Sequence, residues 1–255
     1  MNVFLTGASS GIGAALAEEY AGRGANLGLF ARRADALERV ASALPRDRVA
    51  IYAGDVADAQ ALSAAAVDFI ARFGAPDVVV ANAGISRGAD TAYGEDLAVF
   101  QKVFATNLLG MVHTFAPFVG AMRAVRCGTL VGIASIAGFR GLPGGGAYSA
   151  SKAAAINYLE SLRVEMRDTG VAVVTICPGY IATPMTADNP YRMPFLMPPA
   201  RAARLMARAI ARRRPWYVLP WQMAMAGWVL RHLPRPVFDA AFARAPRKPR
   251  GDPAR

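Results

Sequence analysis

Residues 2–14 read Asn2-Val-Phe-Leu-Thr-Gly-Ala-Ser-Ser-Gly-Ile-Gly-Ala14. A short apolar run stops at small residues, and apolar side chains then recur at the helical spacing of Ile12, Leu16 and Tyr20. This pattern predicts a strand, a tight turn and a helix. Glycines let the backbone bend sharply and let the helix pack closely on the strand. Because N–H groups at a helix start carry partial positive charge, the turn is predicted to hold an anionic group, most simply a pyrophosphate.

Glycine-rich turns also occur in α/β proteins without such a ligand, so the other motifs decide between the two interpretations. Strands are predicted at 26–31, 49–53, 77–81, 129–134 and 171–177, and helices at 35–44, 59–73 and 96–122. Short connections join them in alternation. This order predicts a Rossmann-type α/β fold, a doubly wound parallel sheet with helices on both faces in a single domain.

The chain has 255 residues and a formal net charge of +11, and many of its cations fall late, within 201–214 and 231–250. The length suits one α/β domain, and no linker-like interruption is apparent. No nucleic-acid motif accompanies the cations, which argues against a nucleic-acid partner. We interpret the charge as a solvated surface, with an anionic membrane surface or an acidic partner as the alternatives.

The two cysteines, Cys127 and Cys177, have apolar or strand-like neighbours. Such surroundings are typical of reduced core thiols in a cytosolic protein. The sequence shows no cluster of metal ligands, and His113 and His232 are expected to be structural. Because the first strand is predicted from residue 2, we expect no signal peptide and a cytoplasmic location.

Arg32 and Arg33 follow directly after the predicted strand at 26–31, and no acid occurs before Asp35. In a dinucleotide-binding fold this strand end faces the adenosine ribose. An acid there hydrogen-bonds a free 2′-hydroxyl, whereas an arginine favours a 2′-phosphate. The pair therefore favours NADP over NAD, with an ordinary surface role for the arginines as the alternative.

Two further polar residues each have two candidate roles. Asp55, after the strand at 49–53, is predicted either to accept from the adenine amino group or to cap the next helix. Asn107 lies among apolar residues of the long helix, so it must brace a neighbouring backbone or hold a water.

Tyr148 and Lys152 lie one turn apart on a predicted helix, so the phenol and the ammonium point to the same side. The ammonium is expected to lower the pKa of Tyr148 toward neutrality, because it favours the phenolate. The phenol could then protonate an oxygen as hydride reaches a carbonyl carbon, and act as base in the reverse direction. Ser135, at the end of the strand at 129–134, is placed to give the same oxygen a second hydrogen bond.

Together these motifs resemble the classical short-chain dehydrogenase/reductase family over residues 1–215. Thr6-Gly-Ala-Ser-Ser-Gly-Ile-Gly13 resembles the TGxxxGxG turn of that family, and Asn82-Ala-Gly84 resembles its NAG motif. Pro178-Gly179 and Thr183 resemble its PG motif and the threonine that meets the nicotinamide carboxamide. The resemblance implies a catalytic tetrad and further roles for two of its members, with Lys152 holding the nicotinamide ribose and Asn107 a relay water. The implied tetrad is Asn107, Ser135, Tyr148 and Lys152.

The motifs and the resemblance together predict an NADP(H)-dependent carbonyl reductase or alcohol dehydrogenase, built as a homodimer or homotetramer on the helices after Asp96 and Ser149. The alternative is a non-catalytic NADP-binding sensor or scaffold, which would be expected to lack Tyr148 or Lys152. The extended epimerase/dehydratase type of the same fold is disfavoured, because its glycine spacing differs from the one found here and its chain is usually longer. The residues expected to bind the cofactor are Gly7, Ser9, Ser10, Gly11, Ile12, Gly13, Arg32, Arg33, Asp55, Val56, Asn82, Ala83, Gly84, Tyr148, Lys152, Pro178, Gly179, Ile181 and Thr183.

Substrate choice is expected from two apolar segments, the loop after Ser135 and a lid at 184–200. Their apolar character favours a lipophilic carbonyl compound, and simple packing on the core is the alternative. The residues expected to line the substrate pocket are Phe139, Leu142, Met185, Tyr191 and Phe195.

Residues 216–255 are expected to form an apolar, aromatic extension and a basic tail of the same domain. The uncharged part, 216–230, is interrupted by Pro220 and is shorter than the ~20 residues that span a bilayer. Its tryptophans beside arginines are typical of a segment at a membrane surface, while a subunit interface or a cap over the substrate pocket would explain them equally well. Residues 245–255 are rich in proline and arginine and are expected to be disordered.

Overall fold

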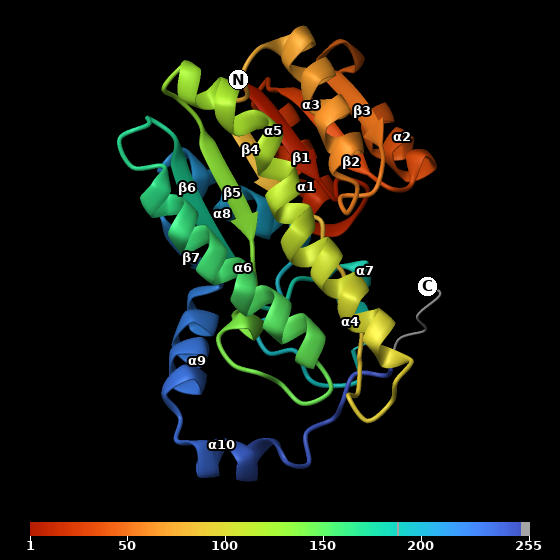
Figure 1. Ribbon diagram of the computed structural model, residues 1–255, viewed down its shortest axis with the longest axis vertical. Coiled ribbons are helices and arrows are strands. Elements are labelled where there is room, and N and C mark those ends of the chain that lie inside the picture. Colours follow the sequence, from red (N-terminus) through yellow and green to blue (C-terminus); the bar gives the residue numbers. More distant parts are fainter. Residues whose placement is uncertain (188, 251–255) are drawn as a thin grey trace.

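The computed structural model describes residues 1–187 and 189–250, and Figure 1 shows its arrangement. Within these ranges, seven strands form one sheet in the order β3-β2-β1-β4-β5-β6-β7, and every neighbouring pair is parallel. The predicted doubly wound parallel sheet is therefore confirmed. The strands are β1 Asn2–Thr6, β2 Asn26–Ala31, β3 Val49–Ala53, β4 Val78–Ala81, β5 Thr129–Ile133, β6 Ala172–Pro178 and β7 Trp216–Leu219.

Helices cover both faces of the sheet (Figure 1). One face packs against α1, α2 and α8, and the other against α3, α5 and α6. Because both faces are covered, strands such as β4 are apolar along their whole length. The helices are α1 Gly11–Ala21, α2 Ala34–Ser42, α3 Ala59–Phe73, α4 Asp96–Phe104, α5 Gly110–Ala124, α6 Gly146–Glu165, α7 Pro184–Ala187, α8 Pro199–Ala211, α9 Trp221–His232 and α10 Arg235–Phe242.

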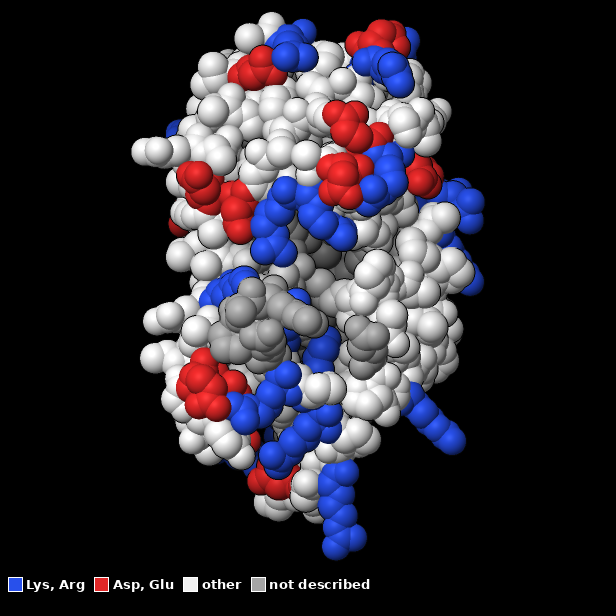
Figure 2. Space-filling model, turned by 90° about the vertical axis from the view of Figure 1, so that its right-hand side faces the viewer, with Lys and Arg blue, Asp and Glu red and all other residues white. Residues whose placement is uncertain are grey.

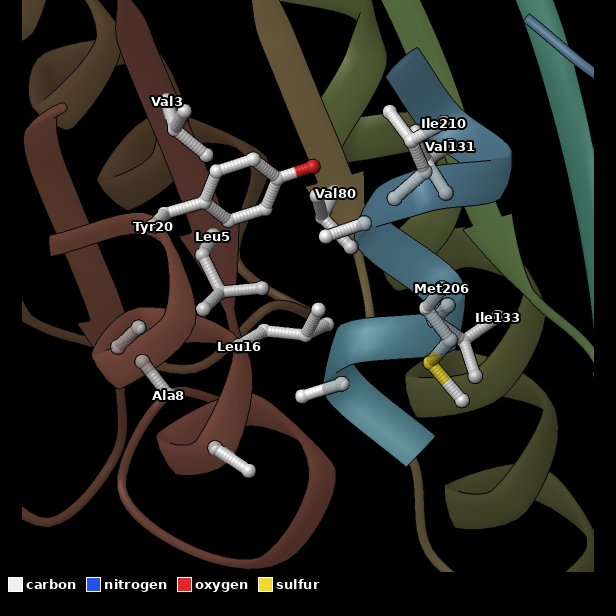
Figure 3. Packing of buried hydrophobic residues seen from close by; sticks show 14 of the residues in the cluster. Val3, Leu5, Ala8, Leu16, Tyr20, Val80, Val131, Ile133, Met206 and Ile210 are labelled. Carbon is white, nitrogen blue, oxygen red and sulfur yellow. The ribbon is translucent and has the colours of Figure 1, made fainter. Parts of the chain in front are cut away.

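The core on the α1 side holds the start of the chain in place. Figure 3 shows Leu5 of β1 and Leu16 of α1 packed toward Met206 of α8, and all three side chains are fully buried. Burial of one such side chain stabilises the fold by about 1.5–3 kcal/mol. These contacts fix the first turn of α1 over the carboxyl end of β1.

The sheet has its topological switch point between β1 and β4, because the chain moves outward from β1 to β3 and then returns to β4 on the other side. In sheets of this kind, ligands bind outside the carboxyl ends of the strands at that point. The glycine turn after β1 and the Asn82-Ala-Gly84 segment after β4 both lie there.

The long helix predicted at 96–122 is divided by a π-helical turn, Ala105–Leu109, between α4 and α5. The extra residue in a π turn shifts the register of a helix, and Asn107 within this turn is 1% exposed. Among the described residues, Asp96–Ala124 is the one helical stretch long and apolar enough to cross a membrane. In its most apolar 18-residue segment, 44% of the residues are buried. It packs on α3 and β4, as a core helix does.

Three details of the chain differ from the sequence predictions. The stretch Trp216–Leu219 is not part of an appended extension but the edge strand β7, with Thr175 of β6 opposite Trp216. Cys177 is a buried free thiol as predicted, but Cys127 is exposed because it follows the end of α5. Residues 245–250, predicted to be disordered, lie against the loop after β4, while 251–255 fall outside the described residues.

Candidate active site

A cavity of about 520 Å³ lies at the carboxyl ends of the central strands. Figure 2 shows a hollow in this face of the molecule, with Lys and Arg side chains on both sides of it. The cavity walls come from the glycine turn, the segments that follow β2 to β5 and the chain beyond β6. Cavities of this size are typical of cofactor and small-molecule sites.

The glycine turn is fixed against the end of β4. Gly7 has φ +66°, and a Cβ there would lie 2.8 Å from the Ala83 Cα. Asn82 Nδ2 donates to the Thr6 and Gly7 carbonyls at 3.0 and 3.3 Å, and the Asn82 N–H donates to Thr6 Oγ1 at 3.2 Å. Only glycine fits this conformation and this close approach, so the shape of the turn is set by the fold itself.

Helix α1 begins directly behind this turn. A Cβ at Gly13 would lie 2.1 Å from the Gly7 carbonyl oxygen, so no larger residue permits the observed packing. Ser10 at the N-cap makes no side-chain cap bond within the described part of the chain, and Ser10, Gly11 and Ile12 line the cavity. The unpaired N–H groups of a helix start suit an anionic ligand.

Arg32, Arg33 and Asp55 line the end of the cavity beside β2 and β3. Arg32 Nη1 lies 3.8 Å from Asp55 Oδ2, and both side chains are about half exposed. Such an exposed pair contributes little to stability. Asp55 accepts from the Ala57 N–H, whereas the cap of α3 is Asp58, so the helix-capping alternative for Asp55 is wrong.

Asn107 braces the backbone that follows β4. Its Oδ1 accepts from the Ile85 N–H at 2.8 Å, and its Nδ2 donates to the Ile85 carbonyl and to Ser151 Oγ, both at 3.0 Å. Of the two predicted roles, the structure therefore shows the bracing of a neighbouring backbone. This contact holds Ile85, which lines the cavity, in place.

Ser135 and Tyr148 lie together on the cavity wall. Ser135 follows β5 and its Oγ accepts from the Ala137 N–H at 3.1 Å, while Tyr148 lies in the first turn of α6. Burial raises the pKa of Tyr148, and a hydrogen bond with Ser135 lowers it by a smaller amount. The phenol is therefore protonated at neutral pH, the form that can donate a proton.

Lys152 is 3% exposed, and its Nζ donates to the Ile133 carbonyl at 2.7 Å. Burial lowers its pKa to about 8. Nζ lies 5.9 Å from the centroid of the Tyr148 ring. The predicted lowering of the Tyr148 pKa by Lys152 is not found here, because the ammonium is directed to a carbonyl and desolvation of the phenol dominates.

Most residues predicted to bind a cofactor line this one cavity, and Gly13 lies directly behind it, against Gly7. Of the predicted catalytic residues, Ser135, Tyr148 and Lys152 line it, and Asn107 lies beside it. Their individual roles remain predictions. The predicted cofactor residues on its wall are Gly7, Ser9, Ser10, Gly11, Ile12, Arg32, Arg33, Asp55, Val56, Asn82, Ala83, Gly84, Tyr148, Lys152, Pro178, Gly179, Ile181 and Thr183.

The predicted substrate residues are only partly brought together. Met185 lines the cavity. Tyr191 lies close to Tyr148, and its pKa is raised first by burial, then by Tyr180 and then by Tyr148. Phe139 instead stacks on Trp216, and Phe195 is 54% exposed. Leu142 lies in the glycine-rich loop, where its carbonyl accepts from the Gly145 N–H, and is absent from the described cavity wall.

The predicted lid at 184–200 has fixed ends. Met197 pairs with Ile181 as an isolated parallel bridge, and its carbonyl accepts from the Ala182 N–H at 2.9 Å. The segment therefore starts after Thr183 and returns at Met197 beside Ile181 and Ala182. Position 188 within it lies outside the described residues.

Sequence reasoning did not name six residues of the cavity wall, and it placed Pro184 and Thr186 only within the lid at 184–200. The six are Ala31, Gly54, Ile85, Thr106, Ile133 and Ala134. Ile85 directly follows the Asn82-Ala-Gly84 segment, and Thr106 precedes Asn107, so their neighbours were the available signal. Thr186 Oγ1 donates to the Ile181 carbonyl at 2.7 Å, a contact that its place in the predicted lid did not reveal.

These features define a nucleotide-binding α/β protein with a phenol, a second hydroxyl and an ammonium at the cavity. The residues fit a dinucleotide, because Gly7 and Gly11 present bare backbone at the cavity wall, where a Cβ would meet Ala83 or Thr183. A nicotinamide cofactor supplies hydride when bound. Tyr148 and Ser135 line the same cavity and place two hydroxyl groups on its wall.

A family model described as short chain dehydrogenase matches residues 1–193. A Myxococcus xanthus protein described as an uncharacterized oxidoreductase is 38% identical over 94% of this chain and 95% of its own length. An 11-beta-hydroxysteroid dehydrogenase-like protein of Arabidopsis thaliana is 40% identical over 70% of this chain and 60% of its own. L-sorbose reductase of Gluconobacter frateurii, solved with NADPH and L-sorbose, has a TM-score of 0.77 and 27% identity over 86% of this chain and 94% of its own.

The chain belongs to the short-chain dehydrogenase family. It is accordingly an oxidoreductase, a dehydrogenase/reductase that acts on CH–OH or carbonyl groups of a small molecule with a nicotinamide cofactor. Family membership and the presence of Tyr148 and Lys152 disfavour the non-catalytic alternative.

Proposed function

We propose that this enzyme interconverts a lipophilic ketone or aldehyde and its alcohol with NADP(H), with Tyr148 as the general acid in reduction. The observation that carries the proposal is the convergence of Ser135, Tyr148 and Lys152 on one end of a cavity whose other end is lined by Arg32 and Arg33. In reduction, Tyr148 donates its proton to the oxygen that Ser135 holds. In oxidation the same phenolate takes the proton back.

The proposed preference for NADP rests on the two neighbouring arginines, Arg32 and Arg33, and on the weak ion pair between Arg32 and Asp55. Arg32 meets Asp55 only at 3.8 Å, so a 2′-phosphate could displace that carboxylate at little cost. A guanidinium also binds phosphate through paired, charge-assisted bonds. The sorbose reductase that is similar to this chain was solved with NADPH.

We expect the double variant Arg32→Ala/Arg33→Ala to bind NADPH at least about 50-fold more weakly, with NADH affected about twofold or less, because only NADPH carries the 2′-phosphate. Nicotinamide fluorescence titration measures both dissociation constants. Arg39→Ala is the matched control, since Arg39 lies on α2, just after the two arginines, but pairs with Asp35. Equal losses for the two cofactors would remove the 2′-phosphate assignment.

A lipophilic substrate is supported by Ile85 and Met185, which line the same cavity as Tyr148, and by Tyr191, which lies close to Tyr148. The plant relative named for a hydroxysteroid supports the same class, whereas the sorbose complex shows that this fold also accepts a polar sugar. NADPH oxidation across a panel that pairs apolar ketones and aldehydes with sugars of similar size tests the proposal. Turnover confined to the sugars would contradict it.

We also propose that the enzyme works in the cytoplasm as a homodimer or homotetramer, in contact with an anionic membrane surface. The exposed side chains Leu97, Leu109 and Val164 on α4, the π turn and α6 support the assembly. The membrane contact rests on α9, where Trp221, Met225 and Trp228 are 67%, 62% and 64% exposed. Their spacing of four and three residues places them on one face of the helix.

Charge around α9 complements anionic lipid. Arg231 and Arg235 flank the join between α9 and α10, and Asp239 is the one acid in the sequence from 216 to 250. Figure 1 shows α9 and α10 at one end of the molecule, beyond the sheet. Indole rings at headgroup depth with neighbouring arginines are typical of interfacial helices.

The double variant Trp221→Gln/Trp228→Gln is expected to bind vesicles that contain phosphatidylserine about tenfold more weakly than the wild type, since it removes two apolar anchors. Co-sedimentation measures the partitioning. Val67→Gln/Val125→Gln is the control, because it removes exposed apolar groups that belong to neither α9 nor the proposed subunit interface. Unchanged binding of the tryptophan variant would end the proposal. Removal of residues 216–255 is unsuitable as a test, because it would delete β7.

A further inference from the structure

The last described residues of the chain pack against α4 and the loops that follow β4 and β5. Figure 1 shows this segment leaving α10 and running to the side of α4, close to the loops that follow β4 and β5. We call residues 247–250 the strap. Lys248 Nζ donates to Ser86 Oγ at 3.1 Å, and Arg250 pairs with Gly88 as an isolated parallel bridge. Ser86 directly follows Ile85, which lines the cavity.

Two glycines admit the strap. A Cβ at Gly88 would lie 2.3 Å from the Pro249 carbonyl oxygen. A Cβ at Gly144 would lie 2.8 Å from the Arg247 Cβ. Gly88 belongs to the loop after β4, and Gly144 lies between Ser135 and Tyr148. The strap therefore bridges the loops on the two sides of the catalytic groups, and its backbone comes closer than a side chain would allow.

Arg250 holds the end of the strap. Its Nε lies 2.9 Å from Asp96 Oδ2 and its Nη2 3.1 Å from Asp96 Oδ1, a two-pronged contact with a carboxylate that is 1% exposed. The same guanidinium reaches Glu95 at 2.8 Å and lies 3.6 Å from the centroid of the Tyr93 ring. Paired, charge-assisted bonds and a cation–π contact make this the strongest of the strap's anchors.

We propose that the strap is the outer wall of the substrate site and that it sets the upper size limit of the substrate. This inference rests on the proposed function and deepens it. The strap spans from Gly144 to Gly88, so a substrate that reaches Tyr148 between these loops meets the strap at its far end. A bulky substrate requires the strap to move away, whereas a small one does not.

The seating of the strap is testable without turnover. Trypsin cleaves after Arg247, and a seated strap protects that bond because cleavage needs local opening. We expect Gly88→Ala and Arg250→Ala to be cleaved at least about tenfold faster than the wild type. Gly94→Ala is the matched control, since a Cβ at Gly94 meets no described atom within 4 Å. Unchanged cleavage of Gly88→Ala would overturn the seating.

The size limit is tested with the same variants. We expect the ratio of kcat/KM for a bulky aryl ketone to that for a four-carbon ketone to rise at least about tenfold in Gly88→Ala and Arg250→Ala, while the Kd for NADPH changes less than about twofold. Gly94→Ala should keep the wild-type ratio. Faster cleavage with an unchanged ratio would overturn the proposed wall. Absence of any carbonyl turnover by the wild type would instead overturn the proposed function, whereas the cleavage result still decides where the strap lies.

Discussion

Tyr148→Phe is expected to lower kcat/KM for carbonyl reduction by about 10³-fold or more, because a positioned general acid contributes about 10²–10⁴-fold. The substitution removes one hydroxyl and keeps the ring. Burial raises the pKa of this phenol, so the wild-type residue carries its proton at neutral pH and can donate it. Steady-state kinetics with NADPH measures the loss, and the Kd for NADPH is expected to change by about twofold or less.

Tyr158→Phe is the matched control, because Tyr158 lies on the same helix and packs in the core away from the cavity. Its activity should remain near that of the wild type. If Tyr148→Phe kept more than a tenth of the wild-type kcat/KM, another group would be the proton donor.

Lys152→Met is expected to lower activity and raise stability together. The loss of activity should be on the order of 10²-fold, because the group expected to hold and orient the nicotinamide ribose is removed. The buried amine costs stability, since its pKa falls from 10.5 to about 8, equivalent to about 3 kcal/mol. After about 1 kcal/mol is subtracted for the unpaired Ile133 carbonyl, the variant should gain about 2 kcal/mol at pH 7.

The gain should depend on pH in a defined direction. Between pH 8 and 10.5 the folded wild type has lost the Lys152 proton while the unfolded chain keeps it, so wild-type stability rises with pH in that window. The advantage of Lys152→Met should therefore be full below pH 8 and fade toward pH 10.5. Urea unfolding at pH 7 and pH 10 measures it, with Lys102→Met as the control. A variant less stable than the wild type at pH 7 would contradict the account.

The fold could be predicted because its signals are local. The glycine turn, the apolar run of β4 and the alternation of strands with helices each depend on a few neighbouring residues. The edge strand β7 was missed because Trp216–Leu219 is short and adjoins Pro215 and Pro220. Its partner, Thr175 on β6, is distant in sequence, and nothing local marks the pairing.

The candidate site could be predicted where a motif fixes the position of the backbone. It was less predictable where tertiary packing decides the direction of a side chain. Ser135, Tyr148 and Lys152 follow from the end of β5 and one turn of α6. Phe139 does not line the cavity because its ring stacks on Trp216 and packs against Gly227. No short sequence pattern reveals these contacts. The strap was missed for a similar reason, since its partner Asp96 lies more than 150 residues earlier in the chain.

The most direct test of the central claim follows the hydride itself. The wild-type enzyme would be incubated with NADPH deuterated at C4 of the nicotinamide and with an apolar ketone, and the alcohol analysed by mass spectrometry. With NADPH labelled on one of the two faces of C4, the account predicts one deuterium at the carbinol carbon. Tyr148→Phe should form this labelled alcohol at least about 10³-fold more slowly. Tight binding of NADPH without deuterium in any alcohol across the apolar ketones and aldehydes would contradict it.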